Sequence, residues 1–311
     1  MKTFQSEDGL SEVIGFILLI GLLVVFLAVY QTYTVPVQGR DTEIDHMNEI
    51  KNTFTAYKIS LDSLWVNERE GTMLSTTLDM GTGGGYSQGG FGNIGFLTPI
   101  SSGGSVGVNQ RNETITVTVG SNIDGVRTLA DFNPGALEYQ SNNYYWIDQN
   151  YYYQLGGVFL EQNSGSTVRV MPPLTIARYG TDEGYTAKVD FTIIRLNGGE
   201  LISGTGPVRV ETNLNNGGII ESPDYVGITN VTITVGSDNP KTLLMWKNLF
   251  EDSLARYGIP SEWYDPLTIS DEKVSLNVIG AQVNGTSLGV YANIIRTNYT
   301  TTLQTVATDI Q

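Results

Sequence analysis

The stretch that decides the fold of this chain is GLSEVIGFILLIGLLVVFLAVY, residues 9–30. From Val13 to Tyr30 it carries no charged side chain, and the terminal tyrosine hydroxyl is its only strong hydrogen-bonding group. As a helix these residues span about 27 Å, close to the roughly 30 Å hydrocarbon core of a bilayer. Because a core helix of a globular protein rarely lacks a polar face over about five turns, the sequence predicts a membrane-crossing helix.

The leader before this helix does not fit an ordinary secretory signal. It holds one basic residue, Lys2, against Glu7, Asp8 and Glu12, and no small-x-small cleavage motif follows the long apolar run. We therefore expect the helix to be retained. Basic residues on its two sides, Lys2 and later Arg40, are too evenly placed to predict orientation.

The same stretch resembles the N-terminus of archaeal type IV pilins and pilin-like surface proteins. In that family the leader ends in a small residue, followed by Ser-x-Val-Ile-Gly and an unbroken apolar helix. The matching positions are Gly9 as last leader residue, Leu10 as first mature residue, and then Ser11, Val13, Ile14 and Gly15. The resemblance implies cleavage between Gly9 and Leu10 by a membrane peptidase on the cytoplasmic side, with the head outside the cell.

The expected assembly helix includes Ser11, Glu12, Val13, Ile14, Gly15 and Gly21, and three of these residues have individual roles. The Glu12 carboxylate complements the helix dipole and could pair with the new amine of a neighbouring subunit. Gly15 and Gly21 leave room for close helix approach. The alternative, an uncleaved single-pass anchor, stays open on the residues alone.

A second helix is predicted after a kink at Pro36 and Gly39. Apolar residues then recur at spacings of 3 or 4, at Ile44, Met47, Ile50, Phe54, Tyr57, Leu61 and Leu64. His46 falls off this stripe, so we interpret it as part of a solvated face and not as a metal ligand or pH switch.

From about Val66 the pattern changes to alternating apolar and polar residues, typical of half-buried antiparallel strands. Strands are predicted at 114–120, 187–196, 207–212, 230–236 and 273–280. A helix is predicted that Asp238 or Asn239 can cap, with Pro240 in its first turn and Gly258 at its end. Its predicted buried stripe is Leu243, Trp246, Phe250, Leu254 and Tyr257. The fold class is α+β: a long N-terminal hydrophobic and amphipathic helix followed by a mainly antiparallel β-sandwich-like head with at least one packed helix.

The expected organisation has four parts. Residues 1–9 are the leader, 10–35 the transmembrane or filament-core helix, 36–66 the amphipathic stalk helix and 67–311 the β-rich extracellular head.

Composition limits the functions of this chain. Asp and Glu outnumber Lys and Arg by 32 to 17, giving a net charge of −15, which disfavours nucleic acid as a partner. Cysteine is absent and there is one histidine, so thiol chemistry, catalytic triads and multi-histidine zinc sites cannot be built. We predict no catalytic residue, no metal ligand and no cofactor; a carboxylate-only glycosidase stays open as a further alternative.

An aromatic segment in the head has two interpretations. Its members are Tyr144, Tyr145, Trp146, Tyr151, Tyr152 and Tyr153. Exposed rings beside amides could bind surface glycans or a partner. The favoured interpretation is a hairpin whose alternate tyrosines support the core.

Sequons mark four candidate glycosylation sites, Asn112, Asn230, Asn284 and Asn298, if the head faces outside. Their number is what chance predicts from the composition, so it carries no information.

The function expected is a non-enzymatic pilin-like subunit, or a minor or adhesive component, of an archaeal type IV pilus-like surface structure. Its expected partners are the membrane, other pilin-like subunits and surface glycans. The alternative is an uncleaved membrane-anchored adhesin or a carbohydrate- or partner-binding protein.

Overall fold

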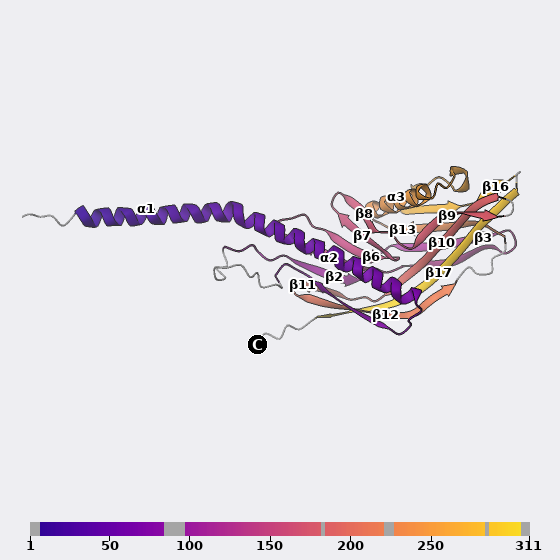
Figure 1. Cartoon of the computed structure of the whole chain (residues 1–311), viewed down its shortest axis with the longest axis horizontal. Helices are drawn as coiled ribbons and strands as arrows, with labels where there is room; N and C mark the ends of the chain where they lie inside the picture. Colours follow the sequence, from indigo (N-terminus) through magenta and orange to yellow (C-terminus); the bar gives the residue numbers. More distant parts are fainter. Residues whose placement is uncertain (1–6, 84–96, 182–183, 221–226, 284–285, 306–311) are drawn as a thin grey trace, which may run out of the picture.

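A computed structural model describes residues 7–83, 97–181, 184–220, 227–283 and 286–305 (Figure 1). One long rod leads into a head built of strands. The rod consists of α1 (Glu7–Val29), a π-helical turn (Tyr30–Thr34) and α2 (Val35–Val66). Figure 1 shows α1 projecting from the head, whereas α2 runs along it. The described part of the chain therefore has the α+β layout that the sequence predicted.

The irregularity predicted at Pro36 and Gly39 begins before them, as a π turn over Tyr30–Thr34. The helix widens to a π turn, in which the Val35 N–H donates to the Tyr30 carbonyl, and Pro36 then lies in the first turn of α2. A proline inside a helix removes a hydrogen bond and crowds the preceding turn. A wider turn just before it relieves that crowding, so the rod continues past Gly39.

Three sheets make up the head. Sheet A orders its strands as β1 (Met73–Asp79), β12 (Pro207–Ile220), β17 (Thr286–Thr305), β10 (Gly184–Asn197) and β9 (Leu174–Thr181), with β16 (Ala281–Val283) paired to β17. Sheet B runs β11 (Leu201–Gly204), β2 (Gly103–Val108), β5 (Leu137–Asn142), β6 (Asn150–Gln154), β7 (Gly157–Gln162) and β8 (Gly165–Val170). Sheet C runs β14 (Ile269–Ser270), β15 (Lys273–Val278), β13 (Ile228–Gly236), β3 (Thr114–Ser121) and β4 (Gly125–Phe132).

Strand pairing is antiparallel apart from the parallel pair β10–β17 among the described strands. The predicted alternation is confirmed in sheet C, where β3 and β13 are neighbours and Val117 lies opposite Ile233. Both side chains are buried while the intervening threonines are more accessible. A single short helical turn, Ser261–Trp263, follows the main helix of the head.

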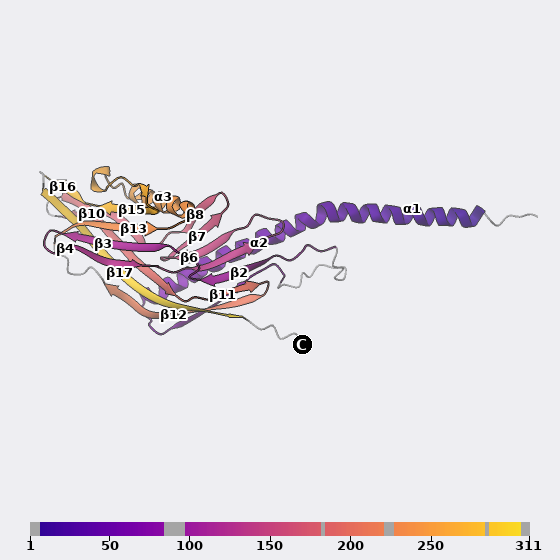
Figure 2. The same cartoon turned by 180° about the vertical axis from the view of Figure 1, so that it is seen from behind.

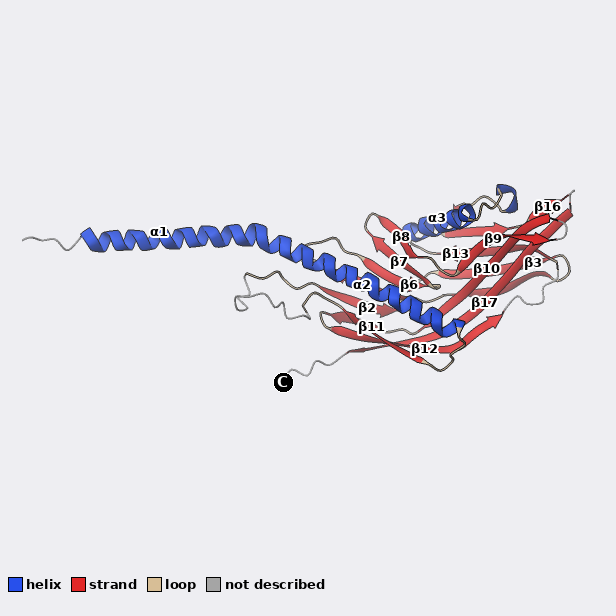
Figure 3. Ribbon diagram, viewed as in Figure 1, coloured by secondary structure: helices blue, strands red, loops and turns tan. Residues whose placement is uncertain are grey.

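Two apolar cores fill the head. One lies between α2 and the faces of sheets A and B, and the other joins sheet C, α3 (Pro240–Arg256) and the opposite faces of those sheets. α2 crosses one side of the head in Figure 1, and β3, β4 and β13 cross the other side in Figure 2. Figure 3 shows α3 as the main helix of the head outside the rod.

α3 starts and ends where the sequence predicted. The Asn239 side chain accepts from the Lys241 N–H at 3.0 Å, and Gly258 adopts a positive φ of 59° just after the end. The predicted buried stripe is confirmed at Leu243, Trp246, Phe250 and Leu254. Tyr257, predicted to join it, is 44% exposed because the helix ends at Arg256 and the stripe ends with it.

Candidate membrane segment and the clasp at its base

α1 presents apolar side chains on every side, and the head covers none of the apolar window that could cross a membrane. Phe16, Leu18 and Leu22 are 65%, 68% and 72% exposed. An uncovered apolar surface of this extent marks a membrane or protein interface. By length and composition the helix can cross a bilayer.

The predicted processing and assembly residues all lie on this helix. Gly9, Leu10 and Ser11 fall in its first turns, with side chains outside the described set. Glu12, Val13 and Ile14 are exposed. A Cβ built on Gly15 or Gly21 would meet no atom within 4 Å, so both positions open onto free space.

α2, in contrast, is held by the head along one side. Of its predicted stripe, six residues are buried and Ile44 is half-buried, which confirms the amphipathic pattern. The Phe54 ring lies 6.4 Å from that of Tyr151, and the Tyr57 ring meets Tyr153 edge-on at 5.3 Å. These contacts bind the rod to sheet B.

Two buried hydroxyls add polar links between α2 and sheet A. Tyr57 shares a hydrogen bond of 2.8 Å with Thr212, and burial raises the pKa of Tyr57 to about 12. From β17, the Tyr299 hydroxyl donates to the Leu61 carbonyl at 2.7 Å. Such buried polar groups need partners, so these bonds also fix the register of α2 on the sheet.

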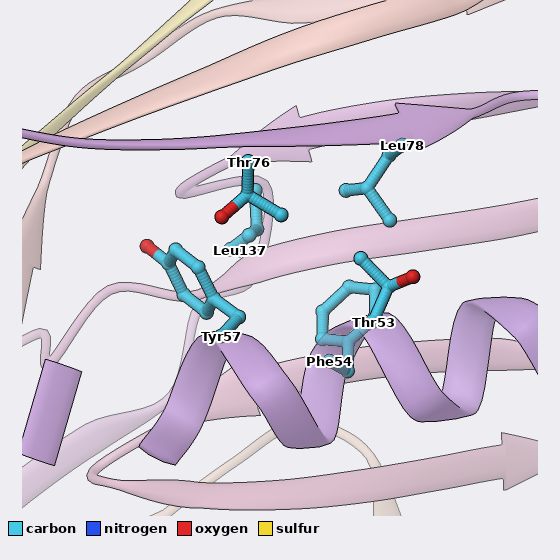
Figure 4. A pocket seen from close by; sticks show the side chains of 6 residues that line it. All are labelled: Thr53, Phe54, Tyr57, Thr76, Leu78 and Leu137. Carbon is cyan, nitrogen blue, oxygen red and sulfur yellow. The ribbon is translucent and has the colours of Figure 1, made fainter. Parts of the chain in front are cut away.

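The hydroxyl of Tyr57 lies beside a small gap between α2 and the neighbouring strands (Figure 4). Its lining side chains are Thr53, Phe54, Tyr57, Thr76, Leu78 and Leu137. The gap has essentially no free volume even for a water-sized molecule, so it is a packing feature and not a ligand site.

The three consecutive tyrosines of β6 correct the glycan-contact hypothesis. Tyr151, Tyr152 and Tyr153 are 4%, 0% and 0% exposed, so their rings are unavailable to a ligand. Alternate side chains of a strand point to opposite faces. Tyr151 and Tyr153 pack on α2, while Tyr152 stacks on Phe159 at 5.1 Å in the other core. The favoured hairpin interpretation is right for these three residues.

The rest of the aromatic segment forms the loop 143–149, which grips the start of α2. The Glu43 carboxylate accepts hydrogen bonds from three successive backbone N–H groups, of Tyr144 at 2.7 Å, Tyr145 at 2.9 Å and Trp146 at 2.6 Å. Glu43 is 1% exposed. Because each carboxylate oxygen is satisfied by an N–H group, the charge is tolerated in the interior. We call this arrangement the clasp.

Two ring contacts complete the clasp. A Cβ on Gly39 would lie 2.3 Å from Cδ2 of Tyr145, so only glycine lets that ring reach the helix. The Arg40 guanidinium lies 4.5 Å from the centre of the Trp146 ring, within range of a cation–π contact. Glycine here serves close packing and not a bend.

The loop holds its shape through its own polar side chains. The Asn143 N–H donates to the Asp148 carboxylate at 2.9 Å, and the Asn143 amide donates to the Ile147 carbonyl at 3.0 Å. At its base the Gln149 N–H donates to the Ser141 hydroxyl at 2.7 Å. These bonds fix the loop in the shape in which all three N–H groups of the clasp point to the Glu43 carboxylate.

His46 does not lie on a solvated face, and that prediction is wrong. It is 7% exposed, and its Nε2 lies 3.1 Å from the Tyr139 hydroxyl, which donates to the Met80 carbonyl at 2.9 Å. The ring nitrogen is therefore the donor to Tyr139. Burial lowers the pKa of His46 below 6.5, although nearby Glu49, Asp79 and Glu43 act to raise it.

Glu43 and the clasp were not predicted from the sequence, yet a signal was present. Glu43 lies four residues before Met47, and Gly39 four before that, so the buried stripe continues through a charge and a glycine. A carboxylate on an otherwise apolar stripe points to a buried partner. Near the start of α2 the head covers a larger part of the helix circumference than a single apolar stripe predicts. This wider cover also explains why His46 is buried.

A buried charge cluster in the head was also missed. The Arg111 guanidinium contacts the carboxylates of Glu113, Glu138 and Glu161 at 2.8–2.9 Å and lies 4.0 Å from the Tyr152 ring centre. Burial raises the pKa of Glu138, opposed by Arg111. Arg111 supplies the positive charge among the three carboxylates. Because Glu138 and Glu161 lie in sheet B, and Arg111 and Glu113 directly precede β3, the cluster joins sheet B to the start of sheet C.

No group of three or more potential metal ligands is found among the residues that the structure describes. The sequence holds three pairs of adjacent acidic residues that a carboxylate-only glycosidase could use, and we expect them to be solvated surface. Glu251 and Asp252 are exposed on α3, and Asp271 and Glu272 form an exposed turn. The third pair, Asp182 and Glu183, lies outside the described residues.

The candidate glycosylation sites differ in access. Asn112 is exposed, whereas the Asn230 amide donates within sheet C to Thr232 and Asn277. Asn298 is half-buried on β17, and Asn284 lies outside the described residues. Asn112 is thus the described sequon whose asparagine is most accessible.

A scan of protein-family models and searches of curated proteins and of solved structures give no match to this chain.

Proposed function

We propose that this chain is a pilin-like subunit, or a minor or adhesive component, of an archaeal type IV pilus-like surface structure. The observation that carries the proposal is the bare α1 helix, whose apolar side chains find no cover on the head. Such a surface is unstable in water and requires lipid or further copies of itself. α1 first anchors the subunit in the membrane and then packs in the core of the assembly.

The way the head holds α2 supports the same role. A subunit of a filament must transmit force from its helix to its head without local unfolding. Here the stalk is fixed by an apolar core, by the hydrogen bonds of Tyr57 and Tyr299, and by the clasp at Glu43. No chemistry is assigned to the head.

Cysteine cross-linking in native membranes tests assembly directly, because the chain has no cysteine of its own. Ile17 and Leu19 are exposed on nearly opposite sides of α1, about 200° apart. The double variant Ile17→Cys/Leu19→Cys should form a ladder of oligomers under oxidation, whereas either single variant should stop at dimers. As a control, the double variant Val126→Cys/Leu201→Cys, with both positions exposed on the head, should give no ladder. Monomers alone from the double variant would contradict assembly through α1.

Processing is tested separately by the mass of the natural protein. The proposal expects a mature chain that begins at Leu10. An intact Met1 would contradict cleavage.

The second candidate is an uncleaved single-pass anchor that carries an adhesin or binding head. It is favoured by Glu7 and Asp8, which precede Gly9 where leaders of the resembling family carry basic residues. This candidate predicts intact Met1, dependence on detergent for extraction, and no cross-linked ladder.

A further inference from the structure

The uncharged part of the rod is longer than the apolar part. No Asp, Glu, Lys, Arg or His occurs from Val13 to Gly39, a run of 27 residues between Glu12 and Arg40. As a helix this run spans about 40 Å, which matches the roughly 40–45 Å of a bilayer including both headgroup regions. If Glu12 lies at one surface, Arg40 lies at the level of the other.

The clasp brings part of the head to that same level. Tyr145 packs on Gly39 and Trp146 on Arg40, while Tyr144 and Ile147 of the same loop are 61% and 53% exposed. A second loop joins them, because the Ile100 N–H donates to the Tyr145 hydroxyl at 3.1 Å. Ile100 is itself 61% exposed.

We infer that these residues form a membrane foot, by which the head rests on the lipid headgroup region beside α1. The foot consists of Ile100, Tyr144, Trp146 and Ile147. The inference rests on the proposed function, since it requires α1 to cross the membrane. Its partner is a lipid surface.

The chemistry of the foot fits the boundary between hydrocarbon and water. Rings of tyrosine and tryptophan favour that boundary because one part of each is apolar and another forms hydrogen bonds. On the rod, exposed Tyr33 lies between α1 and the foot, so aromatic side chains continue from helix to head. Arg40, stacked on Trp146, is placed to meet a lipid phosphate.

The rim of the foot indicates which lipids it contacts best. Asp41, Asp45 and Asp148 are exposed around it, and they repel anionic headgroups. Contact is therefore made through rings and apolar side chains, and zwitterionic lipids satisfy it. The loop backbone is already ordered by Glu43, which lowers the entropy cost of docking.

Tryptophan fluorescence of the full chain in phosphatidylcholine vesicles tests the foot, with bromine placed at shallow or deep positions of the acyl chains. Of the four tryptophans, Trp246 and Trp263 are buried in the core around α3, and Trp65 lies at the far end of α2. Shallow bromines should quench one emitting component, and Trp146→Phe should remove that component. Trp65→Phe is the matched control and should leave the quenching unchanged.

A second probe separates failure of the foot from failure of the proposed function. In the Trp146→Phe background, Phe26→Trp places a tryptophan midway between Glu12 and Arg40, where deep bromines should quench it most strongly. Quenching of this introduced ring, without any quenching of Trp146 in the parent chain, would overturn the foot and leave the membrane helix standing. Absence of both signals would overturn the proposed membrane role and the foot together.

Discussion

α1 and α2 are two halves of one continuous rod, yet they have opposite relations to the rest of the chain. α1 exposes Phe16 and Leu22 by 65% and 72%, whereas α2 buries Phe54 and Leu61 to 1% and 0% exposure. Both are helical, so helix formation does not separate them. What differs is whether apolar residues surround the axis or keep to one side.

The comparison shows what each half needs as a partner. A one-sided helix is satisfied by one surface, and α2 finds it on its own head. A helix that is apolar on every side needs apolar surroundings on every side, and a single folded domain beside it cannot supply them. The rod therefore has one half that packs on the head and one half whose apolar surface the head leaves uncovered.

The largest expected effect comes from a matched pair of phenylalanines. Phe54→Ala removes a buried ring from the core under α2 and should lower the free energy of unfolding of the head by about 3–5 kcal/mol. Phe16→Ala removes an equal ring from α1 and should leave the unfolding of the head unchanged. Both are measured by denaturant unfolding of the full chain in detergent micelles. A similar loss in both variants would contradict the division of the rod.

The next effect sharpens the comparison at the boundary between the two halves. Glu43→Gln replaces a buried carboxylate that accepts three N–H groups with an amide that places a donor among them, and should cost about 1–3 kcal/mol. Glu49→Gln, at an exposed position of α2, should cost little. Unfolding is measured at pH 8, where His46 is neutral in both chains. Equal stabilities of the two variants would show that the clasp contributes nothing.

Hydrogen exchange of the loop gives an independent measure of the same change. In the Glu43→Gln variant the amides of Tyr144, Tyr145 and Trp146 should exchange faster than in the parent chain, while amides of β6 should keep their protection.

The elements of the fold that were predicted are those that carry periodic patterns in the sequence. The apolar N-terminal helix, the stripe of α2, the alternation in β3 and β13, and the start of α3 near Asn239 all depend on residues close in sequence. Such local signals can be interpreted without knowledge of the tertiary structure. The irregularity near Pro36 was predicted as a kink and found as a π turn, because its form depends on how the next helix is held.

The clasp and the Arg111 cluster could not be derived in the same way, because their partners lie far apart in the chain. Glu43 meets a loop about 100 residues later, and Arg111 joins Glu138 and Glu161 across separate strands. The aromatic segment shows the limit clearly. Alternation predicts that Tyr151 and Tyr153 share a face, but composition does not reveal that the adjacent loop, with Tyr145, closes on Gly39.

A smaller effect is expected from paired tyrosines. Tyr57→Phe removes the hydroxyl that bonds to Thr212 in the interior and should cost about 0.5–1.5 kcal/mol. Tyr33→Phe, at a position 69% exposed on the π turn, should leave unfolding of the head unchanged. Urea unfolding of both variants in micelles makes the comparison. If Tyr57→Phe is neutral, the hydrogen bond between Tyr57 and Thr212 contributes nothing to holding α2 on sheet A.

The smallest effect depends on pH and concerns the buried histidine of α2. Burial places the pKa of folded His46 below the value of about 6.5 expected in the unfolded chain. The unfolded chain then takes up a proton at a higher pH than the folded chain does. The stabilisation from neutral His46 is complete above pH about 6.5, declines as pH falls below it, and is lost once pH passes below the folded pKa.

The measurement compares the parent chain with His46→Gln at pH 8 and at pH 5, so that titration of the carboxylates common to both chains largely cancels. The stability of the parent relative to the variant should be smaller at pH 5. The charges of Glu49, Asp79 and Glu43 act to raise the pKa of His46, and Tyr139 is hydrogen-bonded to its ring. All four residues are unchanged in the variant. Because His46 is the sole histidine, its ring protons give one NMR titration curve for the folded chain. A midpoint at or above pH 6.5 would contradict the burial of this side chain, and with it the broad covered arc at the start of α2.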